Sequence, residues 1–263
     1  MVYALVTSAF AMSLIAAPMH SQTADQDYRP TGPARPMITR AQLEQTLAEI
    51  QKQLDSKGYS EGLRSIKRAE ADAIKERLAN GDIRVGDVIQ LLVGGDNNFN
   101  KAYVVTPQVT IVLPRGTEIS LKGKLRAEVQ PYLNERFAEL VVNPAVQATI
   151  AVRLSLEGNV NKPCFACNVD PGMPLSEFLQ GPGGGPGRDV ALDRSYIKRG
   201  GKVIVDGPEF ANAIRDGRTI DELNLQGGDN VFVESKPSKS TIARVVGVVT
   251  GAIGLVYLAT RIR

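Results

Sequence analysis

The sequence AVQATIAVRLSLEGNV, residues 145–160, alternates apolar and polar side chains more regularly than any other part of the chain. Successive side chains of a strand point to opposite faces of a sheet, so this pattern predicts one long β-strand with one buried face. A long strand with a polar second face is typical of an antiparallel or mixed sheet. The positions predicted to be buried are Val146, Ala148, Ile150, Val152, Leu154 and Leu156.

Two amphipathic helices are predicted before this strand. Thr39 followed by Gln42 forms a capping-box signature, which indicates a helix start, and Gly58 ends that helix. A second helix is predicted over residues 61–78, and it stops at Asn80-Gly81. Residues 39–81 are therefore predicted to form a helical hairpin. Its apolar stripes are Leu43, Leu47, Ile50 and Leu54 in the first helix and Leu63, Ile66, Ala73, Ile74 and Leu78 in the second.

From Ile83 onward the apolar period changes from helical to alternating, which predicts an α+β fold. Before the long strand we expect strands over residues 83–93, 109–113 and 117–121, then a helix over residues 122–140 in which Pro131 predicts a kink or a break. After it we expect a hairpin over residues 196–205 that turns at Gly200-Gly201, a strand over residues 229–234, and short helices over residues 175–180 and 208–215.

Both ends of the chain contain uncharged stretches. Residues 2–17 have the length of a signal-peptide apolar region, so residues 1–24 are predicted to be a signal peptide, followed by a linker over residues 25–38. Residues 245–260 are flanked by arginines, which predicts a transmembrane helix over residues 242–263 after a linker over residues 235–241. A buried C-terminal core helix is the alternative. Helix packing in the membrane would use a face formed by Gly247, Gly251 and Gly254.

Composition excludes several classes of function. The 31 basic and 28 acidic residues are mixed along the chain and give a net charge of +3, so no basic stripe for nucleic acid is expected. The single histidine, His20, lies within the predicted signal peptide, so a mature chain would lack every mechanism and metal site that needs imidazole. We expect no metal and no cofactor.

The two cysteines of the chain, Cys164 and Cys167, form a CxxC motif. A closed zinc site needs four ligands, and a thioredoxin-like centre needs the motif at a helix N-terminus, whereas this motif follows a long strand. A local disulfide formed in an oxidising compartment and two unlinked framework thiols both remain open.

Two further features have simple structural interpretations. The sequence GPGGGPG, residues 181–187, lacks the Lys-Ser/Thr pair of a phosphate-binding loop, so Gly183, Gly184 and Gly185 are predicted to lie in a flexible loop that could serve subunit or ligand contact.

Four carboxylates lie among basic residues and are interpreted as the solvated face of a helix. We therefore predict no catalytic residues. The charged residues are Glu118, Glu128, Glu135 and Glu139 beside Lys122, Lys124, Arg126 and Arg136.

Five stretches occur in an order that resembles a known family. They are RVGDVIQLLV (84–93), VLPRGTEISLKGKLRAEVQPYL (112–133), NPAVQATIAVRLSLEGNVNKP (143–163), DPGMPLSEFLQGPGG (170–184) and DELNLQGGDNVFV (221–233). The series is similar to the outer-membrane polysaccharide export proteins of Gram-negative bacteria. The resemblance implies a polysaccharide export domain over residues 82–150 and a soluble-ligand-binding β-grasp (SLBB) domain over residues 151–234.

The resemblance also implies a function without catalysis. Such a protein is secreted to the periplasm, associates with the outer membrane and its lipid, and assembles into a homo-oligomeric ring. The ring would conduct capsule or exopolysaccharide and would meet an inner-membrane polysaccharide co-polymerase. The C-terminal segment has almost no polar face, so it is expected to anchor the protein even if it lines no pore. The alternative is a membrane-tethered periplasmic β-grasp binding module without a pore.

Overall fold

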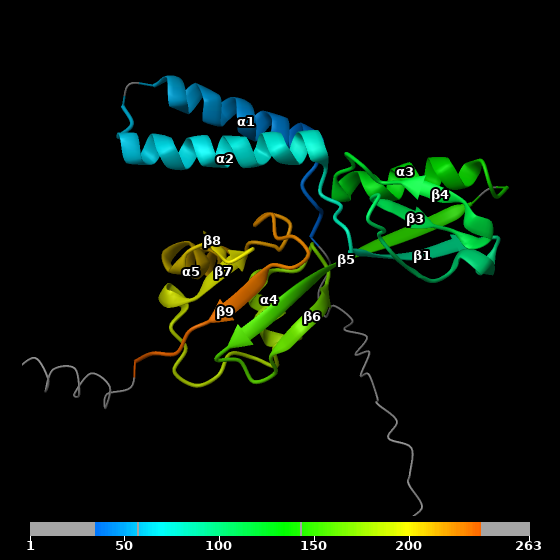
Figure 1. The fold of residues 1–263 in the computed structure, drawn as a ribbon. Coiled ribbons are helices and arrows are strands. Elements are labelled where there is room, and N and C mark those ends of the chain that lie inside the picture. The colour runs from blue at the N-terminus through cyan, green and yellow to red at the C-terminus, as the bar shows by residue number, and fades with distance from the viewer. Residues whose placement is uncertain (1–34, 57, 143, 238–263) are drawn as a thin grey trace, which may run out of the picture.

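A computed structural model describes residues 35–56, 58–142 and 144–237 and shows a mixed α+β protein. A two-helix hairpin extends beside two sheet domains, and one long strand runs through both of them (Figure 1). We call residues 82–151 the first sheet domain and residues 152–237 the second sheet domain. The predicted signal peptide, most of the linker after it, and the predicted transmembrane helix over residues 242–263 lie outside the described residues.

The hairpin consists of α1 (Arg40–Asp55) and α2 (Glu61–Asn80). Its first N-cap is the predicted one, because the Thr39 hydroxyl and the Gln42 side chain form a capping box. Gly81 caps the second helix at a φ of 73°, where its Cβ-less backbone lies against residues 123 and 124. The hairpin has its own small core, which is closed at the base by Leu125 of the first sheet domain: Leu43, Ile50, Ala71, Ile74 and Leu125.

The first sheet domain places one helix over a sheet. Its elements are β1 (Val88–Gly94), η1 (Asn97–Phe99), β2 (Ala102–Val104), β3 (Thr110–Val112), η2 (Pro114–Gly116), β4 (Glu118–Ser120) and α3 (Arg126–Ala138). The buried side of α3 is formed by Val129, Leu133 and Phe137, which pack into the core beneath it. The helix continues through Pro131, so the predicted break does not occur.

Strand β5 (Ala145–Gly158) joins the two domains. Residues 145–151 pair antiparallel with β1, and from Val152 onward the strand pairs antiparallel with β6 (Cys164–Val169). The predicted domain boundary between residues 150 and 151 therefore falls inside one continuous strand, next to the point where its partner changes. The predicted alternation is present, with Val146, Ile150, Val152, Leu154 and Leu156 buried and Ala148 half-buried.

The second sheet domain adds strands on the other side of β5. It contains α4 (Leu175–Gln180), η3 (Leu192–Arg194), β7 (Tyr196–Arg199), β8 (Lys202–Val205), α5 (Gly207–Asp216) and β9 (Asn230–Val233). Strand β9 pairs parallel with β5 and antiparallel with β7, so of the two predicted kinds of sheet, antiparallel or mixed, the sheet is mixed. Strands β2 and β6 were not predicted. The helices α4 and α5 supply Leu175, Phe178 and Phe210 to the core.

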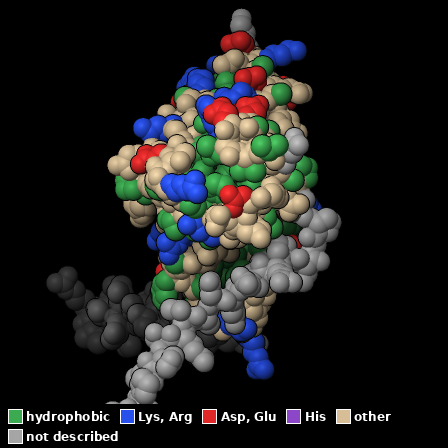
Figure 2. Space-filling model, turned by 90° about the vertical axis from the view of Figure 1, so that its right-hand side faces the viewer, with side chains coloured by type: hydrophobic (Ala, Val, Ile, Leu, Met, Phe, Trp, Pro, Cys, Tyr) green, Lys and Arg blue, Asp and Glu red, His purple; other side chains and the backbone are tan. Residues whose placement is uncertain are grey.

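Charges of both signs are mixed on the surface. The face in Figure 2 shows acidic and basic side chains next to one another among hydrophobic ones. No helix in the described part of the chain is both long enough and apolar enough to span a bilayer.

Candidate functional site

Four buried charged side chains meet where the hairpin contacts both sheet domains. Arg77 and Asp82 form a two-pronged ion pair, with Nε–Oδ1 at 2.6 Å and Nη2–Oδ2 at 3.0 Å. Asp221 Oδ1 accepts hydrogen bonds from Arg77 Nη2 at 2.7 Å and from Arg126 Nη1 at 2.9 Å. Each of the four residues is at most 4% exposed. We call Arg77, Asp82, Arg126 and Asp221 the junction cluster.

The junction cluster joins three separate parts of the chain. Arg77 comes from α2, Arg126 begins α3, and Asp221 lies in the loop between α5 and β9. Asp221 Oδ2 also accepts from the backbone N–H of Ile38, at 2.9 Å. Two positive and two negative charges compensate one another, which removes much of the penalty of burying each. Burial alone lowers the pKa of Arg77, but the hydrogen bonds and charges of Asp82 and Asp221 outweigh it and raise that pKa.

Asp87 is a further buried carboxylate at this junction. Its Oδ2 accepts from the Arg84 N–H at 2.9 Å, while its Oδ1 is buried without a hydrogen-bond partner among the described residues. Burial raises the pKa of Asp87 to about 6, although the Arg84 N–H and the charge of Arg126 oppose the shift. Nearby, the Asp229 carboxylate accepts from Arg199 Nε and Nη2, each at 2.8 Å.

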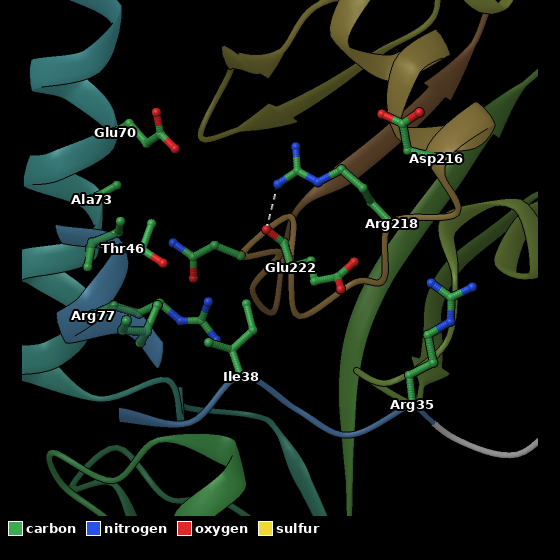
Figure 3. A pocket seen from close by; sticks show the side chains of 12 residues that line it. Arg35, Ile38, Thr46, Glu70, Ala73, Arg77, Asp216, Arg218 and Glu222 are labelled. Carbon is green, nitrogen blue, oxygen red and sulfur yellow. Dashed lines mark hydrogen bonds between the residues drawn. The ribbon is translucent and has the colours of Figure 1, made fainter. Parts of the chain in front are cut away.

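A cavity of about 480 Å³ lies between the hairpin and the second sheet domain. Glu70 and Thr46 extend from the hairpin helices, and the Arg218 guanidinium points back toward them from the opposite side (Figure 3). Arg218 Nη2 donates to the backbone carbonyl of Glu222 at 2.8 Å. The apolar residues of the lining come from the hairpin and the segment just before it, and they are Ile38, Leu43, Ala73 and Ile74.

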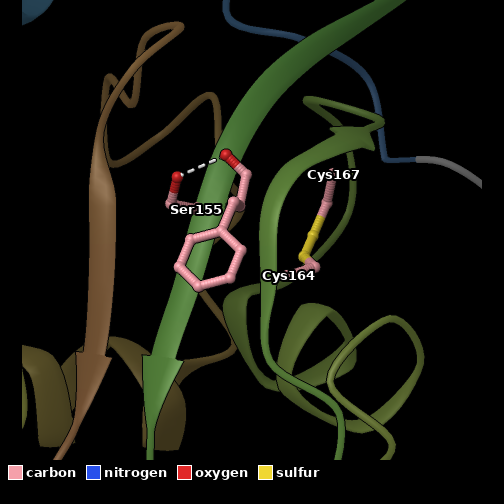
Figure 4. Close-up of a disulfide and its surroundings, with 4 residues drawn as sticks. Ser155, Cys164 and Cys167 are labelled. Atoms are coloured by element: carbon pink, nitrogen blue, oxygen red, sulfur yellow. Dashed lines mark hydrogen bonds between the residues drawn. A yellow bond between two sulfur atoms is a disulfide. The ribbon is translucent and has the colours of Figure 1, made fainter.

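The two cysteines lie on β6, which pairs only with β5 among the described residues. A disulfide joins Cys164 to Cys167, and the Ser155 hydroxyl donates to the Phe165 carbonyl at 2.7 Å in the same region (Figure 4). The motif lies in a strand, so it lacks the helix N-terminus that lowers a thiol pKa in redox enzymes. No cluster of residues suited to a metal ion occurs in the part of the chain that the structure describes.

The glycine-rich loop is hydrogen-bonded to the segment that follows β5. The carbonyls of Gly183 and Gly185 accept from the N–H groups of Lys162 and Asn161 at 2.8 and 3.1 Å. Asn161 Nδ2 donates to the Gly184 carbonyl at 3.0 Å. The loop therefore packs against the segment after β5, and its predicted flexibility stays a prediction. Gly247, Gly251 and Gly254 lie outside the described residues.

The interpretation of the α3 charges as a solvated face is wrong for Arg126 and incomplete for Glu128. Arg126 is 2% exposed and belongs to the junction cluster. Glu128 accepts from Arg40 Nε at 2.7 Å, and this hydrogen bond lowers the pKa of Glu128. Glu118, Glu135 and Glu139 are exposed, as predicted, but Glu118 lies in strand β4 and not on the helix.

Sequence reasoning missed the junction cluster and the cavity. One signal was present for Arg77: it follows Ile74 by three residues, so it lies on a partly apolar side of α2. No comparable signal marks Asp221, whose partners are 95 and 144 residues away.

Comparison with known proteins supports the resemblance described above. Residues 76–151 match the model of a family described as polysaccharide biosynthesis/export protein. The match spans the end of α2, the first sheet domain and the first half of β5, so this part of the chain is similar to the polysaccharide biosynthesis/export family. No curated protein matches the chain. The match supports a role in polysaccharide export.

Proposed function

We propose that this protein is a non-enzymatic component of an export apparatus for capsule or exopolysaccharide. The observation that supports it most is the family match over residues 76–151, which coincides with a folded domain. Strand β5, whose first half lies in the match, continues into the second sheet domain, so the two domains share one strand. We propose that the second sheet domain is the SLBB β-grasp domain.

In this proposal the protein works by assembly. Copies form a homo-oligomeric ring in the periplasm at the outer membrane, sugar passes along its axis, and an inner-membrane polysaccharide co-polymerase docks against it. Residues 242–263 anchor each copy in the membrane, and the glycine face at residues 247, 251 and 254 packs between helices.

Deletion of the gene in its host tests the export role. Loss of secreted polysaccharide, restored by a plasmid copy of the full chain, is the expected result. Undiminished secretion by the deletion strain would refute the role. Mass photometry of detergent-extracted protein tests assembly: discrete rings are expected, whereas a stable monomer would favour a membrane-tethered binding module without a pore.

Membrane fractionation tests the anchor. The full chain is expected in the outer-membrane fraction, and a chain that ends at residue 241 is expected in the soluble periplasmic fraction. Recovery of the shortened chain with the outer membrane would show that other contacts hold the protein there.

A further inference from the structure

The cavity between the hairpin and the second sheet domain has no role in the function proposed so far. Most of the hairpin lies before residue 76, where the family match begins. We propose that this cavity binds a short neutral segment of saccharide. The inference rests on the proposed function, because it takes the exported polymer as the source of the ligand.

The size and walls of the cavity suit a short oligosaccharide. Its volume of about 480 Å³ lies within the range of roughly 300–1,000 Å³ typical of small-molecule sites. Ala73 is exposed on the hairpin side, and the C–H face of a sugar ring can pack against it above the buried Leu43 and Ile74. Polar side chains line both sides of the cavity, so a ligand would meet hydrogen-bonding groups from the hairpin and from the second sheet domain.

The charges favour a ligand that is neutral and rich in hydroxyl groups. Arg35 and Arg218 supply donors, while Asp216 and Glu222 supply acceptors, so the two signs are balanced. Glu70 is already paired with Lys67 at 2.7 Å. The carboxylates would repel an anion, and the guanidinium groups would repel a cation. A hydroxyl group both donates and accepts, so it can bind to groups of either charge.

Much of this hydrogen-bonding capacity is unused within the described residues. Arg35 donates through Nη1 to the Gly217 carbonyl at 2.7 Å, which leaves its other N–H groups for a ligand. One Glu222 oxygen accepts from the Thr219 N–H at 2.8 Å, and the second remains. The Asp216 carboxylate accepts no hydrogen bond from the described part of the chain.

Asn224 is an independent indication of a site. It lines the cavity, and its backbone has a φ of 51°, a left-handed conformation that is uncommon for a residue with a side chain. Its Oδ1 atom is buried without a hydrogen-bond partner among the described residues. Asparagine adopts this backbone conformation readily, so the unpartnered Oδ1 atom carries the indication, because packing for stability alone tends to remove such atoms.

The test measures binding by the full-length protein in detergent. The probes are oligosaccharides released from the host exopolysaccharide by partial acid hydrolysis and separated by ion exchange into neutral and anionic fractions. Saturation-transfer NMR detects binding, and titration gives the dissociation constant. We expect the neutral fraction to bind, and we expect Ala73→Trp, which fills the cavity, to weaken binding by at least tenfold, or about 1.4 kcal/mol.

The matched control is Ala48→Trp, a substitution on an exposed position of α1 that does not line the cavity. It should bind like the wild type. The inference is overturned if the neutral fraction does not bind, if only the anionic fraction or a tetraglycine control binds, or if Ala73→Trp binds with unchanged affinity. Loss of export on gene deletion together with unchanged binding by Ala73→Trp would remove this inference and leave the proposed function standing.

Discussion

Asp221 is the residue on which the junction cluster depends most. Its removal would leave Arg77 and Arg126 buried with reduced compensation, because both donate to the same Oδ1 atom. Breaking a buried ion pair by removing one partner costs about 3–5 kcal/mol. We therefore expect Asp221→Ala to lower the free energy of unfolding by about that amount, measured by urea denaturation of residues 35–237.

A matched control separates this effect from the loss of any carboxylate. Asp72 pairs with Lys75 at 3.1 Å, but both side chains are more than half exposed. Asp72→Ala should change the free energy of unfolding by less than about 1 kcal/mol, because exposed pairs contribute little. Equal losses in the two variants would show that the junction cluster adds no special stability.

The raised pKa of Asp87 predicts how the stability of the protein depends on pH. Its pKa is about 6 in the folded protein against 3.8 for an unperturbed carboxyl, so the folded state binds the proton more tightly. The contribution of Asp87 to stability is therefore fully present below pH 3.8 and is lost as the pH rises through about 6. At roughly 1.4 kcal/mol per pKa unit, the change is on the order of 3 kcal/mol.

Asp87→Asn isolates this contribution. The amide oxygen of asparagine can still accept from the Arg84 N–H, but it does not titrate. We expect the difference in unfolding free energy between variant and wild type to grow in favour of the variant between pH 4 and pH 7. A difference that does not vary with pH would contradict the prediction.

At the scale of single residues, the sequence could not predict that the charged side chains of the junction cluster are buried. Arg126 lies beside three other basic residues, and this local pattern indicates a solvated side chain. Helical spacing does not show which distant segment of the chain covers it. Its partner Asp221 and the Leu225 carbonyl, to which it also donates, belong to a loop about a hundred residues later. Burial at a contact between domains overrides local charge patterning.

Substitution by alanine at two glycines, one in a helix and one in a loop, should change the stability of the protein in opposite directions. Gly62 lies in α2 with open space where a Cβ would lie, so Gly62→Ala should stabilise the protein by about 0.5–1 kcal/mol. A Cβ on Gly183 would lie 2.5 Å from the Leu179 carbonyl oxygen and 2.7 Å from Leu156 Cδ2, so Gly183→Ala should destabilise it. Thermal unfolding measures both, and a stabilised Gly183→Ala variant would contradict the close packing at this glycine.

At the scale of elements, the sequence predicted the helices and strands that have a regular apolar period, a capping residue or a turn signal. The Thr39 capping box, the Gly200-Gly201 hairpin turn and the alternation of β5 all rest on local interactions, and all occur in the structure. Strand β6 was missed because its residues are mostly half-buried or exposed and show no alternation. It forms because β5 offers it an unpaired edge, a contact that lies outside any local window.

At the scale of the molecule, the two sheet domains are joined covalently and by packing. Each has its own hydrophobic core, yet both cores take side chains from β5: Val146 and Ile150 for the first, and Val152, Leu154 and Leu156 for the second. The junction cluster adds charged contacts between the same two domains and the hairpin. Unfolding one domain would therefore remove partners from the other.

This coupling predicts that residues 35–237 unfold as one cooperative unit. Calorimetry should show a single transition whose calorimetric and van't Hoff enthalpies agree, since the loss of β5 would expose part of both cores. Asp221→Ala should broaden this transition or split it, because it removes the charged link between the domains while leaving β5 intact. Two resolved transitions in the wild type would show that β5 connects domains that unfold independently, and the predicted cooperative unit would then be wrong.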